Sequence, residues 1–182
     1  MRSITRTIPF LALALLLTAL RAHAQSGSPT GTTTVSVTIG PQAALTITNS
    51  STPLTTGGSN FSQFTGSTGL TYFVRTTATG GGGTITLKVT TDFSPVGGPS
   101  VGSPPTAGDT LTYTCTVASP GTACTGTQTA ATSSQTNLAT FGTDVHTSTG
   151  GSTASVAWIL TNDPIYKTGT YSATVTFTIS AS

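Results

Sequence analysis

Two cysteines are the residues whose chemistry is easiest to place. Cys115 and Cys124 flank Pro120-Gly121, which suits a type II turn because Pro presets φ and Gly accepts a positive φ. A hairpin with this turn would bring the sulfurs together, and closing the loop would stabilise the fold by about 2.5–3 kcal/mol. The spacing is not C-x-x-C, and no base flanks either residue. We therefore predict a structural disulfide between Cys115 and Cys124 rather than a redox pair.

Asp144 and His146 form the one acid–imidazole pair of the chain beyond residue 25. Residues two apart on a strand share a face, so this pair could supply two metal ligands or a base with its orienting carboxylate. A polar loop after Phe141-Gly142 explains the pair more simply, because no third ligand lies nearby in the sequence. We predict no metal site and no cofactor.

Carboxylates are scarce, because the chain has no Glu and its acidic residues are Asp92, Asp109, Asp144 and Asp163. A two-carboxylate glycosidase would have to draw on these four residues, and Asp163 sits in an Asn-Asp-Pro turn that engages its side chain. A Ser–His–Asp triad would depend on His146, and no G-x-S-x-G motif is present. We predict that the protein is not an enzyme.

Four aromatic residues could stack against sugars, namely Trp158, Tyr72, Tyr166 and Tyr171. Trp158 and Tyr171 are in phase with aliphatic neighbours, which favours core packing, and we expect Trp158 to be buried. Tyr171 follows Gly169 closely at the start of a predicted strand, as in a tyrosine corner, where the hydroxyl fixes a crossing loop. A carbohydrate-binding module stays open as the alternative function.

The first 24 residues have the pattern of a secretory signal peptide. Arg2 and Arg6 precede an apolar run over residues 8–20, and Ala22-His23-Ala24 is a small-x-small cleavage site. The run has about 13 residues, fewer than the roughly 20 that span a bilayer. We predict cleavage before Gln25, an exported product at the cell surface, in the periplasm or outside the cell, and no transmembrane segment after cleavage.

The composition excludes several classes of protein. Only 5% of the 182 residues are charged, against about 25% in a typical soluble domain, and about a quarter of the residues are Thr. Beyond residue 25 the basic residues are Arg75, Lys88 and Lys167, which with four Asp leave a net charge of −1. We expect no nucleic-acid partner and no coiled coil, since both need many charges.

Alternation of apolar with polar residues predicts strands along the chain. Residues 25–31 are expected to be a flexible leader, and residues 32–182 a single domain. Residues 94–108, rich in Pro and Gly, are expected to be one long loop. The expected strands contain Val35-Val37-Ile39, Leu45-Ile47, Leu70-Tyr72-Val74, Ile85-Leu87-Val89, Leu111-Tyr113-Cys115-Val117, Leu138-Phe141, Val156-Trp158-Leu160 and Tyr171-Ala173-Val175-Phe177-Ile179.

Seven or eight such strands, each with one apolar face, predict two sheets packed face to face. We predict an all-β, immunoglobulin-like Greek-key sandwich, with a jelly roll or another Greek-key sandwich as the alternative. No fixed-period repeat is present, which argues against a β-solenoid.

The last strand resembles that of secreted pilin-type sandwiches, the chaperone–usher fimbrial subunits and the spore coat protein U family. In such pilins a Gly lies fourteen residues from the C-terminus, and apolar residues occupy the eighth, sixth and fourth places from the end. Those places hold Gly169, Val175, Phe177 and Ile179 here. The leader before Val35 is also similar to the N-terminal donor region of these families. The resemblance implies a surface subunit that assembles with copies of itself or with a pilus-type chaperone.

The two terminal strands carry no charge, whereas soluble monomers usually protect edge strands with Lys, Pro or bulges. Either these strands are covered in the fold, or they pair with another chain by strand addition. We predict an exported, non-catalytic structural or adhesive surface subunit that self-associates. The alternative is a module that binds a surface polysaccharide or another ligand. The residues expected to take part in strand addition are Val35, Val37, Ile39, Val175, Phe177 and Ile179.

Overall fold

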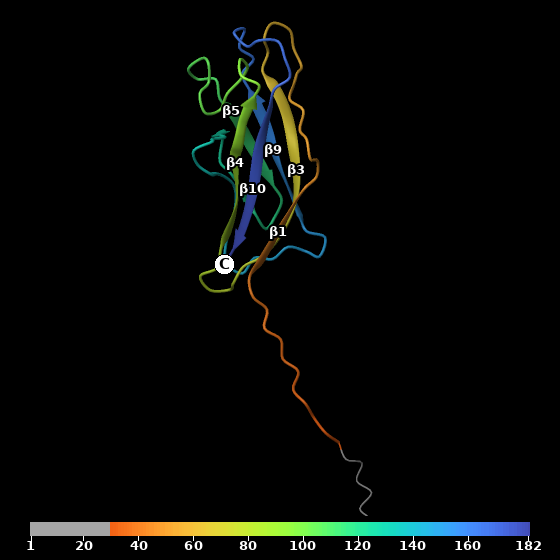
Figure 1. The fold of residues 1–182 in the computed structure, drawn as a ribbon. Helices are drawn as coiled ribbons and strands as arrows, with labels where there is room; N and C mark the ends of the chain where they lie inside the picture. The colour runs from red at the N-terminus through yellow and green to blue at the C-terminus, as the bar shows by residue number, and fades with distance from the viewer. Residues whose placement is uncertain (1–29) are drawn as a thin grey trace, which may run out of the picture. The chain divides into compact units, whose positions relative to one another are not determined.

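The computed structural model describes residues 30–182. The predicted signal peptide, residues 1–24, and the leader up to residue 29 lie outside the described residues. Thr38–Ser182 form one compact unit. This unit is an all-β sandwich of two antiparallel sheets (Figure 1). Residues 30–37 are described separately below.

One sheet is six-stranded, with the order β1-β3-β9-β5-β7 and with β2 paired to β3. The other sheet is four-stranded, with the order β10-β4-β8-β6. The strands are β1 Gln42–Ile47, β2 Thr55–Thr56, β3 Phe64–Arg75, β4 Gly83–Ser94, β5 Leu111–Val117, β6 Thr122–Ala123, β7 Gln128–Thr129, β8 Thr136–Phe141, β9 Ser152–Leu160 and β10 Ser172–Ala181.

The core lies between the sheets, where the alternating apolar residues of each long strand meet. Strands β3, β5 and β9 contribute side chains such as Leu70, Tyr113 and Val156, and strand β4 contributes Ile85 and Leu87. Tilted aromatic pairs link strands within and across the sheets: Tyr113 with Trp158 at 5.5 Å, and Tyr72 with Phe141 at 5.3 Å between ring centroids. The outward positions are largely Thr and Ser, which suit the solvent face of a strand.

The order of the long strands is that of an immunoglobulin sandwich, with one strand absent. Strands β1-β3-β9-β5 correspond to A-B-E-D, and β10-β4 correspond to F-C. In the complete fold a seventh strand, G, lies beside F. Within residues 30–182 no strand pairs with β10 on that edge, where β10 faces β1 of the other sheet. We call the edge formed by β1 and β10 the open side.

Most of the predicted strands are confirmed, and residues 95–110 connect β4 to β5 without a strand. The prediction for the first strand is wrong. Residues 32–39 form no strand, and Val35, Val37 and Ile39 are 91%, 81% and 65% exposed. Apolar and polar residues alternate in this segment, but within residues 30–182 it pairs with no strand. The first strand of the sandwich therefore begins at Gln42.

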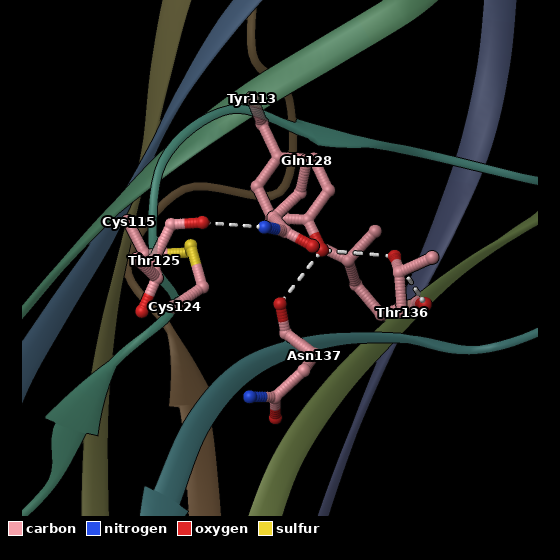
Figure 2. The surroundings of a disulfide bond; sticks show 8 residues. Tyr113, Cys115, Cys124, Thr125, Gln128, Thr136 and Asn137 are labelled. Carbon is pink, nitrogen blue, oxygen red and sulfur yellow. Dashed lines mark hydrogen bonds between the residues drawn. A yellow bond between two sulfur atoms is a disulfide. The ribbon is translucent and has the colours of Figure 1, made fainter.

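The opposite edge, which we call the closed side, carries the short strands β6 and β7 and the disulfide. Cys115 of β5 is bonded to Cys124, which follows β6, and their Cα atoms are 5.5 Å apart. Figure 2 shows the bond with Tyr113 and Asn137 nearby. The Tyr113 hydroxyl lies 2.8 Å from both the Asn137 carbonyl and the Thr136 hydroxyl, and thus ties β5 to β8.

The predicted disulfide is present, but the predicted hairpin around it is wrong. Strand β5 belongs to one sheet and β6 to the other, so the disulfide joins the two sheets. Gly121 does not have the positive φ that a type II turn needs, so the predicted type II turn is also wrong. The chain crosses from one sheet to the other between β5 and β6, because β5 pairs with β9 and β6 pairs with β8.

Gly121 is required at this crossing because of close packing. A Cβ atom there would lie 2.6 Å from Val117 Cγ1 and 3.0 Å from the Phe141 ring. The Gly121 N–H donates to the Tyr72 hydroxyl at 3.1 Å, and that hydroxyl donates to the Ala118 carbonyl. The hydroxyl of the buried Tyr72 thus fixes the backbone of Ala118 and Gly121 where the chain crosses between the sheets.

Candidate functional site: a groove on the open side

A groove with a volume of about 780 Å³ runs along the open side between β10 and the segment that follows β1. One wall is β10, with Ala173, Val175 and Phe177. The other wall is Ile47 with residues 49–54. The floor is apolar and comes from both sheets, with the side chains of Phe64, Phe93, Leu111, Trp158 and Leu160.

The inward face of β10 is less covered than that of its neighbour. Val175 and Phe177 are opposite Val89 and Leu87 of β4, which are fully buried, but they are only partly buried themselves. A strand at an ordinary sandwich edge would have its inward residues covered by the facing sheet. Here the apolar face of β10 opens into the groove. The groove therefore offers both apolar surface and a free strand edge.

The three predicted strand-addition residues of the last strand do not have equal positions. Val175 and Phe177 line the groove, whereas Ile179 lies farther along β10, opposite the buried Ile85, and does not line it. Ala173 of the same strand also lines the groove, although the sequence did not predict it as a strand-addition residue.

Trp158 in the floor is buried, as predicted, at 4% exposure. Its Nε1–H donates to the Thr68 hydroxyl at 2.8 Å, and Thr68 Oγ1 lies 2.7 Å from Thr52 Oγ1. This chain of hydrogen bonds fixes the groove wall at Thr52 to the core. Leu54 packs close over Gly66, where a Cβ atom would lie 2.7 Å from Leu54 Cδ2. Trp158 is thus a packing residue with a satisfied N–H, and it presents no free face for a sugar.

The loops at one end of the groove are held by carboxylates; we call residues 48–62, 95–110 and 161–171 the loop end. Asp92 accepts hydrogen bonds from the Ser100 hydroxyl at 2.6 Å and from the N–H groups of Phe93, Val101 and Gly102 at 2.7–3.1 Å. Burial raises the pKa of Asp92, but the hydrogen bonds outweigh burial and hold this pKa below its usual value.

Asp109 and Asp163 brace the same end. Hydrogen bonds from the Thr106 hydroxyl and the Ile165 N–H lower the pKa of Asp163, so its side chain is engaged in its turn as predicted. The Tyr166 hydroxyl donates to the buried Asp109 at 2.8 Å. Burial, together with both carboxylates, raises the pKa of Tyr166. These side chains therefore hold the loops together through hydrogen bonds.

Tyr171 forms the bond expected of a tyrosine corner. Its hydroxyl donates to the Lys167 carbonyl at 2.7 Å, and its ring packs on Gly98, where a Cβ atom would lie 2.4 Å away. The Lys167 N–H in turn donates to the Gly97 carbonyl at 2.8 Å. The loop before β10 and the loop after β4 are therefore tied together at the entrance of the groove.

Phe61 lines the groove at the loop end, and no sequence signal pointed to it. It is 61% exposed, and its φ of 57° follows a φ of 64° at Asn60. Positive φ values are rare for an aromatic residue. The loop is braced by a 2.7 Å contact between the Thr56 and Ser62 hydroxyls and by a 3.2 Å hydrogen bond from Asn162 Nδ2 to the Ser62 carbonyl.

At the other end of the sandwich, which we call the base, Arg75 and His146 lie together. They form an isolated antiparallel bridge and line a hollow of about 380 Å³ with Gln42, Ala44 and Phe73. The Arg75 Nε–H donates to the Gly40 carbonyl at 2.8 Å.

Asp144 lies in a loop with a φ of 56°, so it and His146 do not share a strand face. No group of three or more His, Cys, Asp or Glu side chains comes together within residues 30–182. That same part of the chain contains no helix able to cross a bilayer.

Comparison of the chain with protein-family models, curated proteins and solved structures finds no match.

Proposed function

We propose that this protein is an exported, non-catalytic structural or adhesive subunit of the cell surface, which assembles by adding a strand of one copy to the groove of another. The observation that carries the proposal is the edge of β10 that no strand of residues 30–182 pairs with, next to an apolar groove. A free edge supplies backbone hydrogen bonds, and the groove supplies pockets for alternate side chains.

The occupant that we propose is the segment of residues 32–39 of a second copy. It carries no charge, and its apolar residues Val35, Val37 and Ile39 alternate with Ser and Thr. Three alternate residues span about 13 Å in a strand, the same length as Ala173 to Phe177 on β10. Since these three side chains are exposed in their own chain, their burial in a neighbour would remove apolar surface from water.

Export follows in the proposal from the signal-peptide pattern and suits the disulfide, since disulfides persist in oxidising compartments. In this proposal, a pilus-type chaperone would cover the groove before assembly.

A single substitution in the segment tests the proposal without disturbing the sandwich. Val37→Lys would place a charge in the neighbour's apolar groove, and we expect it to abolish assembly of the chain from residue 25 onward, measured by sedimentation velocity. Ser36→Lys is the matched control, because its side chain would face outward, and it should assemble. Both variants should melt at the wild-type temperature.

Deletion of residues 25–39 gives a second test. The truncated chain should stay monomeric and should bind a peptide of residues 32–39, which would fill its groove. If the wild-type chain is monomeric at the highest concentration it tolerates, and no chaperone partner is recovered with it, strand addition is wrong. Retention of that monomer on a polysaccharide column would then favour a carbohydrate-binding module.

A further inference from the structure

The segment proposed to leave the chain is joined to the sandwich by a very short link. Only Gly40 and Pro41 separate Ile39 from Gln42, the first residue of β1. Three residue steps span at most about 11 Å. If Ile39 occupies the groove of a neighbour, the base of its own sandwich must therefore lie against that neighbour.

The direction of the added strand decides which surfaces meet. Strand G of an immunoglobulin sandwich runs antiparallel to F, so residues 32–39 would run antiparallel to β10. Ile39 would then lie beside Ala173, at the loop end, with the bulkier side chain next to the smaller one. The base of one copy would face the loop end of the next.

These two surfaces have complementary features. The loop end presents the exposed ring of Phe61, and the base contains the hollow lined by Phe73, Arg75 and His146. A guanidinium and an aromatic ring attract each other. The loop end contains Asp109, Asp163 and the single cation Lys167, and Asp92 of β4 is hydrogen-bonded to it, whereas the base contains Arg75 and His146 with Asp144.

We infer that, within the proposed assembly, the base of one copy docks on the loop end of the next, with Phe61 seated in the hollow beside Arg75 and His146. The inference rests on the proposed strand addition and extends it to a second, rigid interface. The inferred contact accounts for the exposure of Phe61. The backbone at Phe61 has a positive φ, and the loop holds the apolar ring in solvent, where a partner would cover it.

Cysteine cross-linking tests this contact. The described residues contain no free cysteine, so Phe61→Cys and His146→Cys each add the only reactive thiol of the described chain. Mixed in equal amounts and oxidised mildly after assembly, the two variants should give a cross-linked dimer in up to about half of the chains, because random mixing gives each thiol a complementary neighbour about half of the time. Each variant alone should give little. Ser67→Cys, on the exposed outer face of β3, is the matched control and should not cross-link with His146→Cys.

The outcomes separate the two proposals. Assembly on sedimentation, with no more cross-linking than the Ser67→Cys control, overturns the inference and leaves strand addition standing. Cross-linking of His146→Cys with itself would indicate base-to-base contact and also overturns it. Failure of the wild-type chain to assemble removes the proposed function, and the inference with it.

A substitution gives an independent measure that does not depend on cross-linking. Phe61→Ala should raise the concentration for half-assembly about 10- to 30-fold, as expected for the loss of an aromatic at the centre of an interface. Because Phe61 also lines the groove, the same substitution is made in the chain without residues 25–39, where it should change the affinity for the peptide of residues 32–39 by less than about threefold. An equal loss of peptide affinity would assign the effect to the groove and overturn the docking. Val96→Ala, which truncates another exposed apolar residue of the loop end outside the groove lining, should change the concentration for half-assembly less than about twofold. Equal effects of the two variants would overturn the docking of Phe61.

Discussion

The two edges of the sandwich differ in how their outermost strands are covered. On the closed side, β5 and β8 are each capped by a two-residue strand, and a disulfide joins the sheets. On the open side, β1 and β10 are left as free strands with a groove between them. Natural proteins blunt or cover edges that must not pair. Within residues 38–182, the two sides therefore differ in that the short strands β6 and β7 and the disulfide cover only the closed side.

The largest effect should come from the groove floor. Trp158→Ala should cost about 3–5 kcal/mol of unfolding free energy, because it removes a buried aromatic residue and leaves Thr68 without its donor. Chemical denaturation gives the value. A variant as stable as the wild type would mean that Trp158 is exposed, and would revive the sugar-stacking interpretation.

On the closed side, replacing both Cys115 and Cys124 by Ser should cost about 2.5–3 kcal/mol, the value for a short loop in the chain-entropy model. The same variant should assemble as the wild type does once it is folded, since neither residue lines the groove. Thiol labelling of denatured, unreduced wild-type protein should find no free cysteine. Loss of assembly by the folded variant would contradict the proposal that the closed side stabilises the fold and the open side assembles.

A smaller effect is expected at the crossing between sheets. Gly121→Ala should destabilise the fold by about 1–3 kcal/mol, because its Cβ atom would contact Val117, Tyr72 and Phe141 too closely. Gly142→Ala is the matched control: it has open space around it and no positive φ, and it should change stability by less than about 0.5 kcal/mol. Thermal melts of the two variants decide the matter.

The smallest effect should be the response of the loop end to acid. The folded pKa of Asp92 is lowered, so its contribution to stability is complete above the unfolded value of about 4 and is lost as the pH falls through the folded value. Solvent screening limits this contribution to less than about 1 kcal/mol.

Asp92→Asn should therefore flatten the dependence of melting temperature on pH below about 4. A slope unchanged by Asp92→Asn would show that Asp92 does not hold the loop.

The sequence predicted the strands well because alternation is local. The alternation of Leu70, Tyr72 and Val74 indicates a buried face whichever strand lies beside them. The disulfide was predictable because Cys124 is the one other cysteine in the sequence. The same reasoning failed at residues 32–39, because alternation indicates an apolar face but not which chain covers it. It also failed at Pro120-Gly121, where a turn signal does not say which sheet each flanking segment will join.

The groove itself could not be predicted, because it lies where no strand of residues 30–182 pairs with the outer edge of β10. The polar chain from Trp158 through Thr68 to Thr52 joins residues far apart in the sequence, and no local pattern marks it. Phe61 was missed because a single aromatic between Asn and Ser resembles any loop residue. Its position becomes informative only through the backbone conformation and the neighbouring groove.

The scarcity of charge also bears on how the protein would respond to a protease. Beyond residue 29 a trypsin-like protease has only three residues to cleave after, namely Arg75, Lys88 and Lys167. The first two end or lie within paired strands. The third stands in a loop, the usual place of cleavage, yet its N–H is held by Gly97 and its carbonyl by Tyr171. We therefore expect the tyrosine corner to slow cleavage after Lys167, the one basic residue in a loop beyond residue 29.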